Sequence, residues 1–128
     1  MSKKVEYTVH DGVAIVAMTN APVNALGLEL RQALYTALEA AIEDAECQAI
    51  VLIGKNGQFS AGADIKEFAS PKTYATPTLS ELLALVDSCP KPVVAAIAGV
   101  ALGGGLDLAL AAGYRVIHKT AIIGLPEV

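Results

Sequence analysis

Residues 93–113 read VVAAIAGVALGGGLDLALAAG, and the interpretation of this stretch decides the fold. The run is long and apolar enough to resemble a membrane-spanning helix. However, Gly103–Gly105 disfavour a continuous helix, and Asp107 would cost about 2.5 to 3.5 kcal/mol near the centre of a span. The β-branched residues at its start are typical of a buried strand. We therefore predict a strand at Val93–Ile97, a glycine turn, and a buried helix that ends near Ala112.

The N-terminal part of the sequence predicts a hairpin, a helix and a strand. Val5–His10 and Val13–Met18 are β-rich and are separated by Asp11-Gly12, a two-residue hairpin signal. Apolar residues recur every four positions from Leu26 to Ile42, which predicts an amphipathic helix of about five turns. Ala49–Ile53 is a continuous apolar run, typical of a strand that is buried on both faces.

The C-terminal part continues the alternation of helix and strand. Residues 70–77 contain two prolines, which argue against a helix, and Thr78 is predicted to cap a helix that ends before Pro90. Tyr114–His118 and Ala121–Ile123 are predicted as short strands. The alternation predicts an α/β domain with right-handed crossovers and a largely parallel sheet.

The composition predicts one domain whose surface is partly covered by other protein. With 128 residues, 54% of them hydrophobic and 17% charged, the chain can bury a core of its own. Its mean hydropathy of +0.52 is high, which indicates surfaces covered by another copy or by further sequence. A net charge of −4, without a run of Lys or Arg, argues against nucleic acid and anionic membranes as partners.

The cysteines and the N-terminus favour a reducing compartment. Cys47 and Cys89 lie far apart and form no CxxC or Cys/His cluster, so neither a metal site nor a disulfide is predicted. Charged residues interrupt the first twelve positions, MSKKVEYTVHDG, so no signal-peptide core is present there. We expect a cytoplasmic protein without a membrane span.

Two small-residue loops are candidates for chemistry. Ser60–Asp64 and Gly103–Gly105 each follow a predicted strand and precede a helix start. Backbone N–H groups at a helix start lack intrahelical partners, and two such loops on neighbouring parallel strands can direct two N–H groups at one oxyanion. The alternative is that the glycines only permit tight turns and close packing. Asp107 favours the chemical interpretation, because burying an acid on an apolar helix is costly unless it is paired or lines a cavity.

Other catalytic and nucleotide-binding patterns are absent from the sequence. GKNG at residues 54–57 lacks the GK[ST] of a P-loop, and no GxGxxG joins a strand to a helix. His10 and His118 have no serine or cysteine partner at a recognisable turn, so both are interpreted as surface or structural residues.

Four stretches, taken together, resemble one known family. They are APVNALG (21–27), FSAGADIKEF (59–68), AAIAGVALGGGLDLALAAGYRV (95–116) and GLPEV (124–128). Their order and spacing are similar to those of the crotonase family, the enoyl-CoA hydratase/isomerase superfamily, and most similar to the hydratase/isomerase part of multifunctional β-oxidation enzymes. The resemblance implies the N-terminal part of a crotonase-like ββα spiral. Because the family's domain continues beyond the position of Val128, we expect residues 1–128 to be a single, truncated domain.

The resemblance also implies roles for individual residues. It places the oxyanion hole at the N–H groups of Ala63 and Gly104, and the two catalytic acids at Asp107 and Glu127. The residues implied to bind coenzyme A are Ala25, Ala61, Ala63, Asp64, Ile65 and Lys66. For Lys66, a solvated surface charge is an equally good interpretation. The substrate is expected to be a coenzyme A thioester, with no metal and no separate cofactor.

The implied activity is enoyl-CoA hydration, with two alternatives. Hydratases of the family carry Glu where this chain has Asp107, which withdraws the carboxylate by roughly 1.5 Å, one C–C bond. Isomerisation of enoyl-CoA or dienoyl-CoA is therefore the first alternative. The second is a non-catalytic coenzyme A-binding or assembly module. The expected partners are an acyl-CoA, and either further copies of the chain or the rest of a multifunctional enzyme.

Overall fold

The computed structural model describes residues 4–125 and has an α/β architecture. A five-stranded sheet has the order β1-β2-β3-β4-β6. Its strands are β1 (Val5–His10), β2 (Val13–Met18), β3 (Ala49–Gly54), β4 (Val93–Ile97) and β6 (Tyr114–Ile117). The β1–β2 hairpin is antiparallel and every other pairing is parallel, so the predicted α/β class and largely parallel sheet are confirmed.

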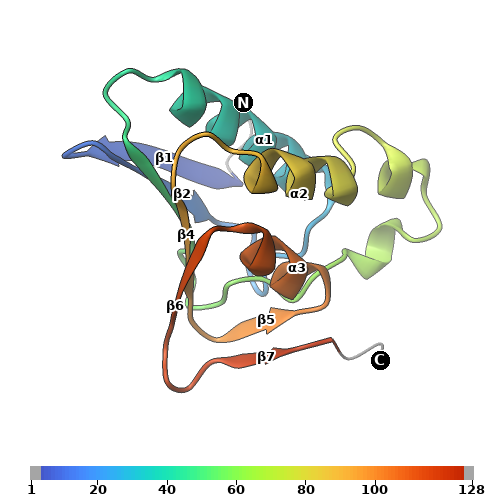
Figure 1. Cartoon of the computed structure of the whole chain (residues 1–128). Helices are drawn as coiled ribbons and strands as arrows, with labels where there is room; N and C mark the ends of the chain where they lie inside the picture. The colour runs from blue at the N-terminus through green and yellow to red at the C-terminus, as the bar shows by residue number, and fades with distance from the viewer. Residues whose placement is uncertain (1–3, 126–128) are drawn as a thin grey trace.

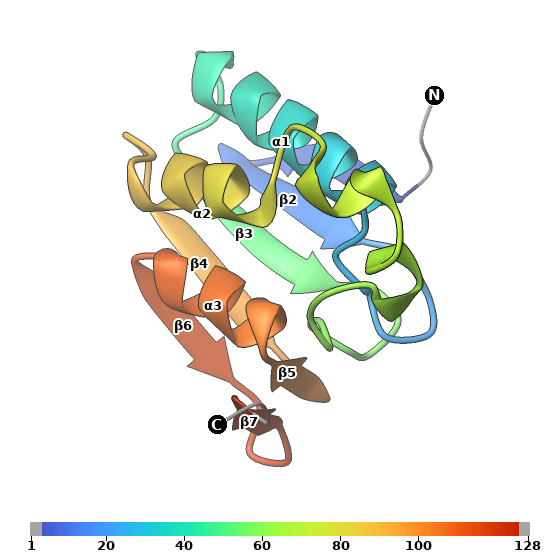
Figure 2. The same ribbon diagram turned by 90° about the vertical axis from the view of Figure 1, so that its right-hand side faces the viewer.

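Three helices cover one face of this sheet (Figures 1 and 2). They are α1 (Leu28–Glu43), α2 (Leu79–Asp87) and α3 (Gly104–Ala111). The predicted cap of α2 is present as a capping box: the Thr78 hydroxyl accepts a hydrogen bond from the Glu81 N–H, and the Glu81 carboxylate accepts one from the Thr78 N–H. The hairpin turn is also as predicted, since Asp11 and Gly12 both have positive φ angles.

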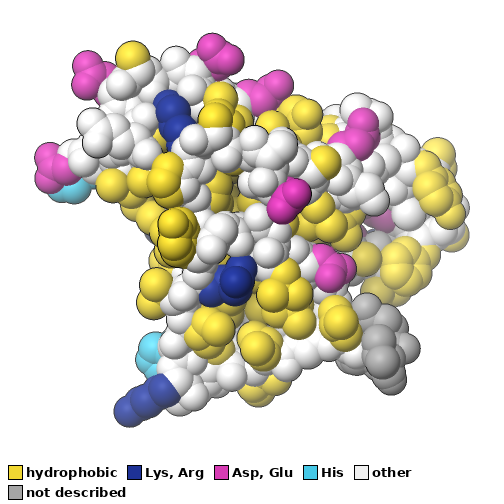
Figure 3. Space-filling view, in the orientation of Figure 1, with side chains coloured by type: hydrophobic (Ala, Val, Ile, Leu, Met, Phe, Trp, Pro, Cys, Tyr) yellow, Lys and Arg dark blue, Asp and Glu magenta, His cyan; other side chains and the backbone are white. Residues whose placement is uncertain are grey.

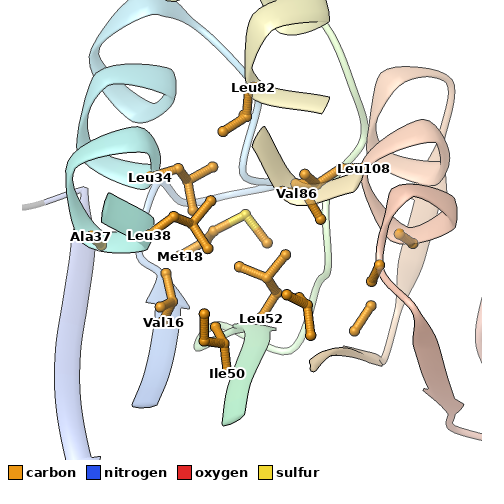
Figure 4. Close-up of a cluster of buried hydrophobic side chains, with 14 of the residues drawn as sticks. Val16, Met18, Leu34, Ala37, Leu38, Ile50, Leu52, Leu82, Val86 and Leu108 are labelled. Atoms are coloured by element: carbon orange, nitrogen blue, oxygen red, sulfur yellow. The ribbon is translucent and has the colours of Figure 1, made fainter. Parts of the chain in front are cut away.

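The core lies between the helices and the sheet, as Figure 4 shows. Apolar side chains four residues apart on α1, such as Leu34 and Leu38, pack above alternate residues of the strands, such as Ile50 and Leu52 of β3. All four are at most 1% exposed. The periods of four on the helix and two on the strand therefore produce one continuous apolar layer.

Two predictions about burial and helix start were wrong. The α1 helix begins at Leu28 rather than Leu26, because Gly27, in an extended conformation, is its N-cap. β3 is not buried on both faces: Ile50 and Leu52 are buried, whereas Val51 and Ile53 are only half-buried. Within residues 4–125 the helices cover one face of the sheet only, so the other face is left partly open.

The segments around the glycine loops contain more structure than the sequence predicted. β5 (Val100–Leu102) pairs in parallel with β7 (Ile122–Gly124) in a second, two-stranded sheet. Residues 70–77 were predicted to lack helix, but they include the 3₁₀ helix η2 (Pro71–Tyr74), because Pro71 occupies the first turn, where a missing N–H costs nothing. A shorter 3₁₀ helix, η1 (Ile65–Glu67), precedes it.

The strands near the C-terminal end expose apolar side chains. Tyr114 and Val116 on the edge strand β6 are 63% and 65% exposed, and Ile122 on β7 is 63% exposed. Hydrophobic side chains are prominent in the lower half of Figure 3, near these elements. No helix within residues 4–125 is long and apolar enough to cross a membrane. Residues 93–113 contain the predicted strand and helix, but β5 lies between them and was not predicted.

Candidate functional site

The two small-residue loops lie side by side because they leave neighbouring parallel strands at the same end. Residues 55–64 follow β3 and residues 98–103 follow β4. Backbone hydrogen bonds join the loops: the Ser60 N–H donates to the Val100 carbonyl and the Leu102 N–H donates to the Ser60 carbonyl, both at 3.0 Å. The loops are thus fixed to each other along their length rather than meeting at one point.

Glycines allow the loops to approach at van der Waals distance. A Cβ atom on Gly62, which has a φ of +98°, would lie 3.1 Å from the Gly104 nitrogen. One on Gly104 would lie 3.8 Å from the Ala63 nitrogen. One on Gly105 would overlap the Ser60 carbonyl oxygen. The sequence therefore needs glycine here for close backbone contact as well as for turn geometry.

The amides of Ala63 and Gly104 are close together and lack acceptors among the described residues. Gly104 is the first residue of α3, and the first bond within the helix runs from the Asp107 N–H to the Gly103 carbonyl. Neither the Ala63 N–H nor the Gly104 N–H donates a hydrogen bond to another residue of the described chain. Ala63 is exposed. Both N–H groups are consequently available to an oxygen atom of a ligand.

Two buried polar residues support the first loop, and the sequence reasoning gave them no role. The Nδ2 of fully buried Asn24 lies 2.8 Å from the Gln58 carbonyl oxygen and 3.0 Å from the Phe59 carbonyl oxygen. The hydroxyl of buried Ser60 donates to the Asn24 carbonyl at 2.7 Å and accepts from the Gly62 N–H at 3.1 Å. The position of Asn24 in APVNALG was noticed, but a sequence pattern does not show which acceptors its amide meets.

Asp107 lies in the first turn of α3 and is half-buried. With Leu83, Asp87 and Leu110, among others, it lines an open cavity of about 370 Å³ between α2 and α3. Its carboxylate forms no hydrogen bond or ion pair within residues 4–125, so lining a cavity is what makes its burial tolerable. Glu127 lies outside the described residues, and its pairing with Asp107 stays a prediction.

The residues predicted to bind coenzyme A gather around the first loop. Ala25 and Ala61 are half-buried, and the Ala61 N–H donates to the Val23 carbonyl at 2.9 Å, which joins the two segments. The Asp64 carboxylate caps η1 by accepting from the Lys66 N–H at 3.0 Å. The Ile65 side chain is 76% exposed.

A second cavity, of about 490 Å³, adjoins this loop. Its lining includes Lys4, Asn20, Gly27, Asp64, Lys66 and Lys72. The lining therefore contains three lysines together with acidic and amide groups. Lys66 is exposed and its ammonium group has no described partner, so it is free to reach an anion in this cavity.

Arg31 is the largest departure from the sequence interpretation. Arg31 is not one of the apolar positions that recur every four residues along α1, and the pattern therefore predicts that it lies on the surface. In the structure the residue is only 4% exposed. Its guanidinium forms an ion pair with Glu67, which lies in the segment that follows Ala63. It also donates hydrogen bonds to the carbonyls of Lys72 and Pro77 in the same segment. An isolated arginine in an amphipathic helix carries no sequence signal for burial, because its acceptors come from a distant loop.

The two histidines lie on the surface, as interpreted from the sequence. His10 is exposed beside Asp11, with a nitrogen-to-oxygen distance of 3.4 Å, and His118 Nδ1 lies 2.8 Å from the Thr120 hydroxyl. Cys47 and Cys89 are free thiols. The part of the chain that the structure describes contains no group of His, Cys, Asp and Glu suited to hold a metal ion.

Comparison with known proteins shows similarity over nearly the whole chain. Residues 8–128 match the family model described as enoyl-CoA hydratase/isomerase. The chain is 49% identical to the peroxisomal bifunctional enzyme of Danio rerio and 45% identical to that of Homo sapiens, covering 94% and 96% of the chain. It spans only 16% and 17% of those enzymes. It is 40% identical to a probable enoyl-CoA hydratase of Bacillus subtilis, half of whose length it spans.

Solved structures share the fold. An enoyl-CoA hydratase/carnithine racemase from Magnetospirillum magneticum superimposes with a TM-score of 0.90 at 30% identity, covering 98% of this chain and 50% of that one. The enoyl-CoA hydratase from Bacillus anthracis gives 0.89 at 31% identity, with 98% and 51% covered. The predicted crotonase-like fold is confirmed, and the chain corresponds to about half the length of these proteins.

Proposed function

Because the chain belongs to the enoyl-CoA hydratase/isomerase family, we propose that it binds enoyl-CoA thioesters and promotes addition of water to their double bond. The observation that carries the proposal is the pair of adjacent N–H groups, on Ala63 and Gly104, that have no acceptor in the described chain. The relatives named as β-oxidation multifunctional proteins and hydratases support this class of chemistry.

The two N–H groups serve as the oxyanion hole in this proposal. When water adds to the β-carbon of the enoyl group, negative charge develops on the thioester oxygen as an enolate. Donors already fixed at that oxygen stabilise the charge without reorganisation, and one such donor is worth about 2.7 to 4 kcal/mol in other enzymes. The hydrogen bonds between the loops of Ser60 and Val100 provide the required rigidity.

The acids Asp107 and Glu127 move the protons. One carboxylate takes a proton from the attacking water, whose oxygen bonds to the β-carbon. The other acid, in its protonated form, gives a proton to the α-carbon as the enolate collapses. The sum is addition of one water molecule, so the chemistry needs no metal and no redox cofactor.

The loop after Ala63 is proposed to hold coenzyme A. The backbone at Ala61, Ala63 and Ile65 is assigned to the adenine end, and Ala25 is a further proposed contact of coenzyme A. Lys66 is assigned to a phosphate, with the 490 Å³ cavity that it lines as the space available for that group. Asp64 contributes indirectly, because its carboxylate fixes the Lys66 backbone.

Isomerisation is the second candidate activity. Asp107 is one methylene shorter than the glutamate of family hydratases, and misplacement of about 1 Å can cost about 100-fold in rate. A single acid that shuttles a proton from Cα to Cγ of a β,γ-unsaturated thioester needs no positioned water. The shorter side chain favours this variant, and the same oxyanion hole serves it.

A direct assay separates these activities from simple binding. With crotonyl-CoA as the substrate, a decrease in the absorbance of the conjugated enoyl group measures hydration. With a β,γ-unsaturated thioester as the substrate, an increase in the same absorbance measures isomerisation. Calorimetry with crotonyl-CoA measures affinity. Affinity without turnover supports the non-catalytic module, and absence of any affinity in the 128-residue chain contradicts the proposal.

The proposal extends to assembly and location. We expect residues 1–128 to act as one domain within a larger assembly, either with further copies or as part of a longer chain. The exposed apolar side chains of β6 and β7 support this expectation. The free thiols of Cys47 and Cys89 are consistent with a reducing compartment, and the cytoplasm remains the prediction. Several relatives are named as peroxisomal or glyoxysomal proteins. Sedimentation of the chain tests assembly.

A further inference from the structure

The segment from Ala63 to Pro77 is not held in place by buried side chains. None of its residues is buried, and neither η1 nor η2 contributes a side chain to the core. Its large apolar side chains, Phe68 and Tyr74, are 62% and 81% exposed. Burial of apolar area therefore contributes little to the position of this segment, and polar contacts must fix it.

Arg31 of α1 supplies most of those polar contacts. Its guanidinium is buried, and all three nitrogens donate hydrogen bonds. The backbone acceptors within the segment are the carbonyls of Pro77 at 2.8 Å from Nε, and of Lys72 and Ala75 at 2.8 and 3.3 Å from Nη2. Nη1 donates to the Leu26 carbonyl at 2.8 Å. The Arg31 side chain thus joins the start of α1 to η2 and to the residues that follow η2.

Glu67 completes the connection from the side of the loop. Its carboxylate accepts from the Leu28 N–H, the first N–H of α1, at 2.9 Å, and lies 3.4 Å from Arg31 Nη1. An acid at a helix N-terminus is favoured by the helix dipole. Gly27 leaves room for it, since a Cβ there would lie 2.8 Å from a Glu67 oxygen and 3.0 Å from an Asp64 oxygen.

We infer that Arg31 and Glu67 are positioning residues that clamp the segment 63–77 onto α1 and thereby set the orientation of the Ala63 N–H and of Lys66 for a coenzyme A thioester. The inference rests on the proposed function for the identity of the ligand. A buried ion pair is weak evidence for stability, but it is well suited to selecting one geometry, because any other arrangement leaves a buried charge unpaired. The Glu67 N–H donates to the carbonyl of Asp64, the residue after Ala63, at 3.0 Å, so displacement of Glu67 is transmitted to Ala63.

The test uses the 128-residue chain with three substitutions and two readouts. Arg31→Gln removes the charge and most of the hydrogen-bond donors. Arg31→Lys keeps the charge but loses the planar arrangement of donors on the guanidinium. Glu67→Gln keeps the shape of the side chain but not its charge. Lys55→Met is the matched control, since it breaks the exposed ion pair between Lys55 and Glu6, 2.6 Å long, and neither side chain hydrogen-bonds to residues 63–77. The readouts are amide hydrogen exchange along the chain and the dissociation constant for crotonyl-CoA.

We expect Arg31→Gln to raise exchange at residues 63–77 about tenfold and to weaken crotonyl-CoA binding about tenfold. Exchange in the strands should stay within twofold of the parent. Arg31→Lys should recover part of both effects, and Lys55→Met should change neither. Unchanged exchange at 63–77, or a rise of equal size in the sheet, overturns the inference. If Arg31→Gln does not fold, Glu67→Gln decides the question by the same criteria.

The two readouts also separate this inference from the proposed function. If the parent chain does not bind crotonyl-CoA, the proposed function fails, and the exchange pattern still shows whether the clamp holds the segment. If the parent binds and the variants loosen the segment without losing affinity, the role of Arg31 and Glu67 in positioning the ligand is wrong while the proposed function stands.

Discussion

The amide nitrogen of Ala63 lies 3.8 Å from the position that a Cβ atom on Gly104 would occupy. These residues are far apart in the sequence, and each lies at the end of a loop that leaves the same edge of the sheet. We propose that one ligand oxygen accepts hydrogen bonds from both N–H groups.

Gly104→Ala should weaken acyl-CoA binding without unfolding the protein. The new methyl group would crowd the end of the Leu79 side chain, at 2.9 Å, and would lie 3.8 Å from the Ala63 nitrogen, near the proposed position of a ligand oxygen. We expect about a tenfold increase in the dissociation constant of crotonyl-CoA, about 1.4 kcal/mol, by calorimetry. Gly113→Ala is the control, because its methyl group meets only the Val93 carbonyl at 3.9 Å. Equal affinities for both variants would argue against the proposed oxyanion hole.

Asp107→Asn should greatly reduce turnover while leaving the fold intact. The carboxylate has no partner in the described chain, so its loss removes only a favourable interaction with the start of α3, worth about 0.3 to 1 kcal/mol. Enoyl-CoA hydration or isomerisation, where the parent shows it, should fall at least about 100-fold, since general acid–base catalysis contributes this much. Asp87→Asn changes another acid of the same cavity and should retain activity. An active Asp107→Asn variant would exclude this residue as a catalytic acid.

Asn24→Ala should be strongly destabilising. It leaves the carbonyls of half-buried Gln58 and buried Phe59 without this donor. It also places a non-glycine residue at a φ of +52° without the local hydrogen bonds that favour asparagine. We expect a loss of about 2 to 4 kcal/mol in the free energy of unfolding, measured with urea. Asn24→Gly relieves the backbone strain alone and should recover part of the loss. Asn56→Ala, at an exposed partner of the same amide, should cost less than about 1 kcal/mol; a similar cost at both positions would contradict this account.

The Glu81 capping box should make stability depend on pH. The hydrogen bond from the Thr78 N–H lowers the pKa of the Glu81 carboxyl from its ordinary value of 4.5, more than its slight desolvation raises it. Because the pKa is lower in the folded state, the stabilisation is fully present above about pH 4.5 and is lost as the pH falls through the lowered value. Glu81→Gln keeps a capping side chain without the titration.

Urea unfolding of the parent and Glu81→Gln across pH 2 to 7 measures this dependence. The difference in stability between them should be constant near neutral pH and should shrink in acid. Glu39→Gln, at an exposed position in the middle of α1, is the control and should show no comparable change. A difference between parent and Glu81→Gln that persists at pH 2 would show that the charge of the cap is unimportant.

The sequence by itself determined the order and type of most elements. The hairpin signal at Asp11-Gly12, the period of four in α1 and the cap at Thr78 are local, so short-range physics suffices to predict them. The glycine loops and Asp107 were identified because their residue types are unusual for their surroundings. The similarity of four separated motifs to one family then predicted the fold that comparison with solved structures confirms.

Only the tertiary structure decided which groups meet. Three features depend on partners at least twenty residues away in the sequence: the burial of Arg31, the acceptors of Asn24 and the pairing of β5 with β7. An exception is the hydrogen bond from Arg31 to the Leu26 carbonyl. The half-buried state of β3 depends on which face the helices cover. A sequence pattern records the preference of a residue for apolar or polar surroundings, whereas the identity of its partner is set when the chain packs, and this is why the clamp on α1 had no signature in the sequence.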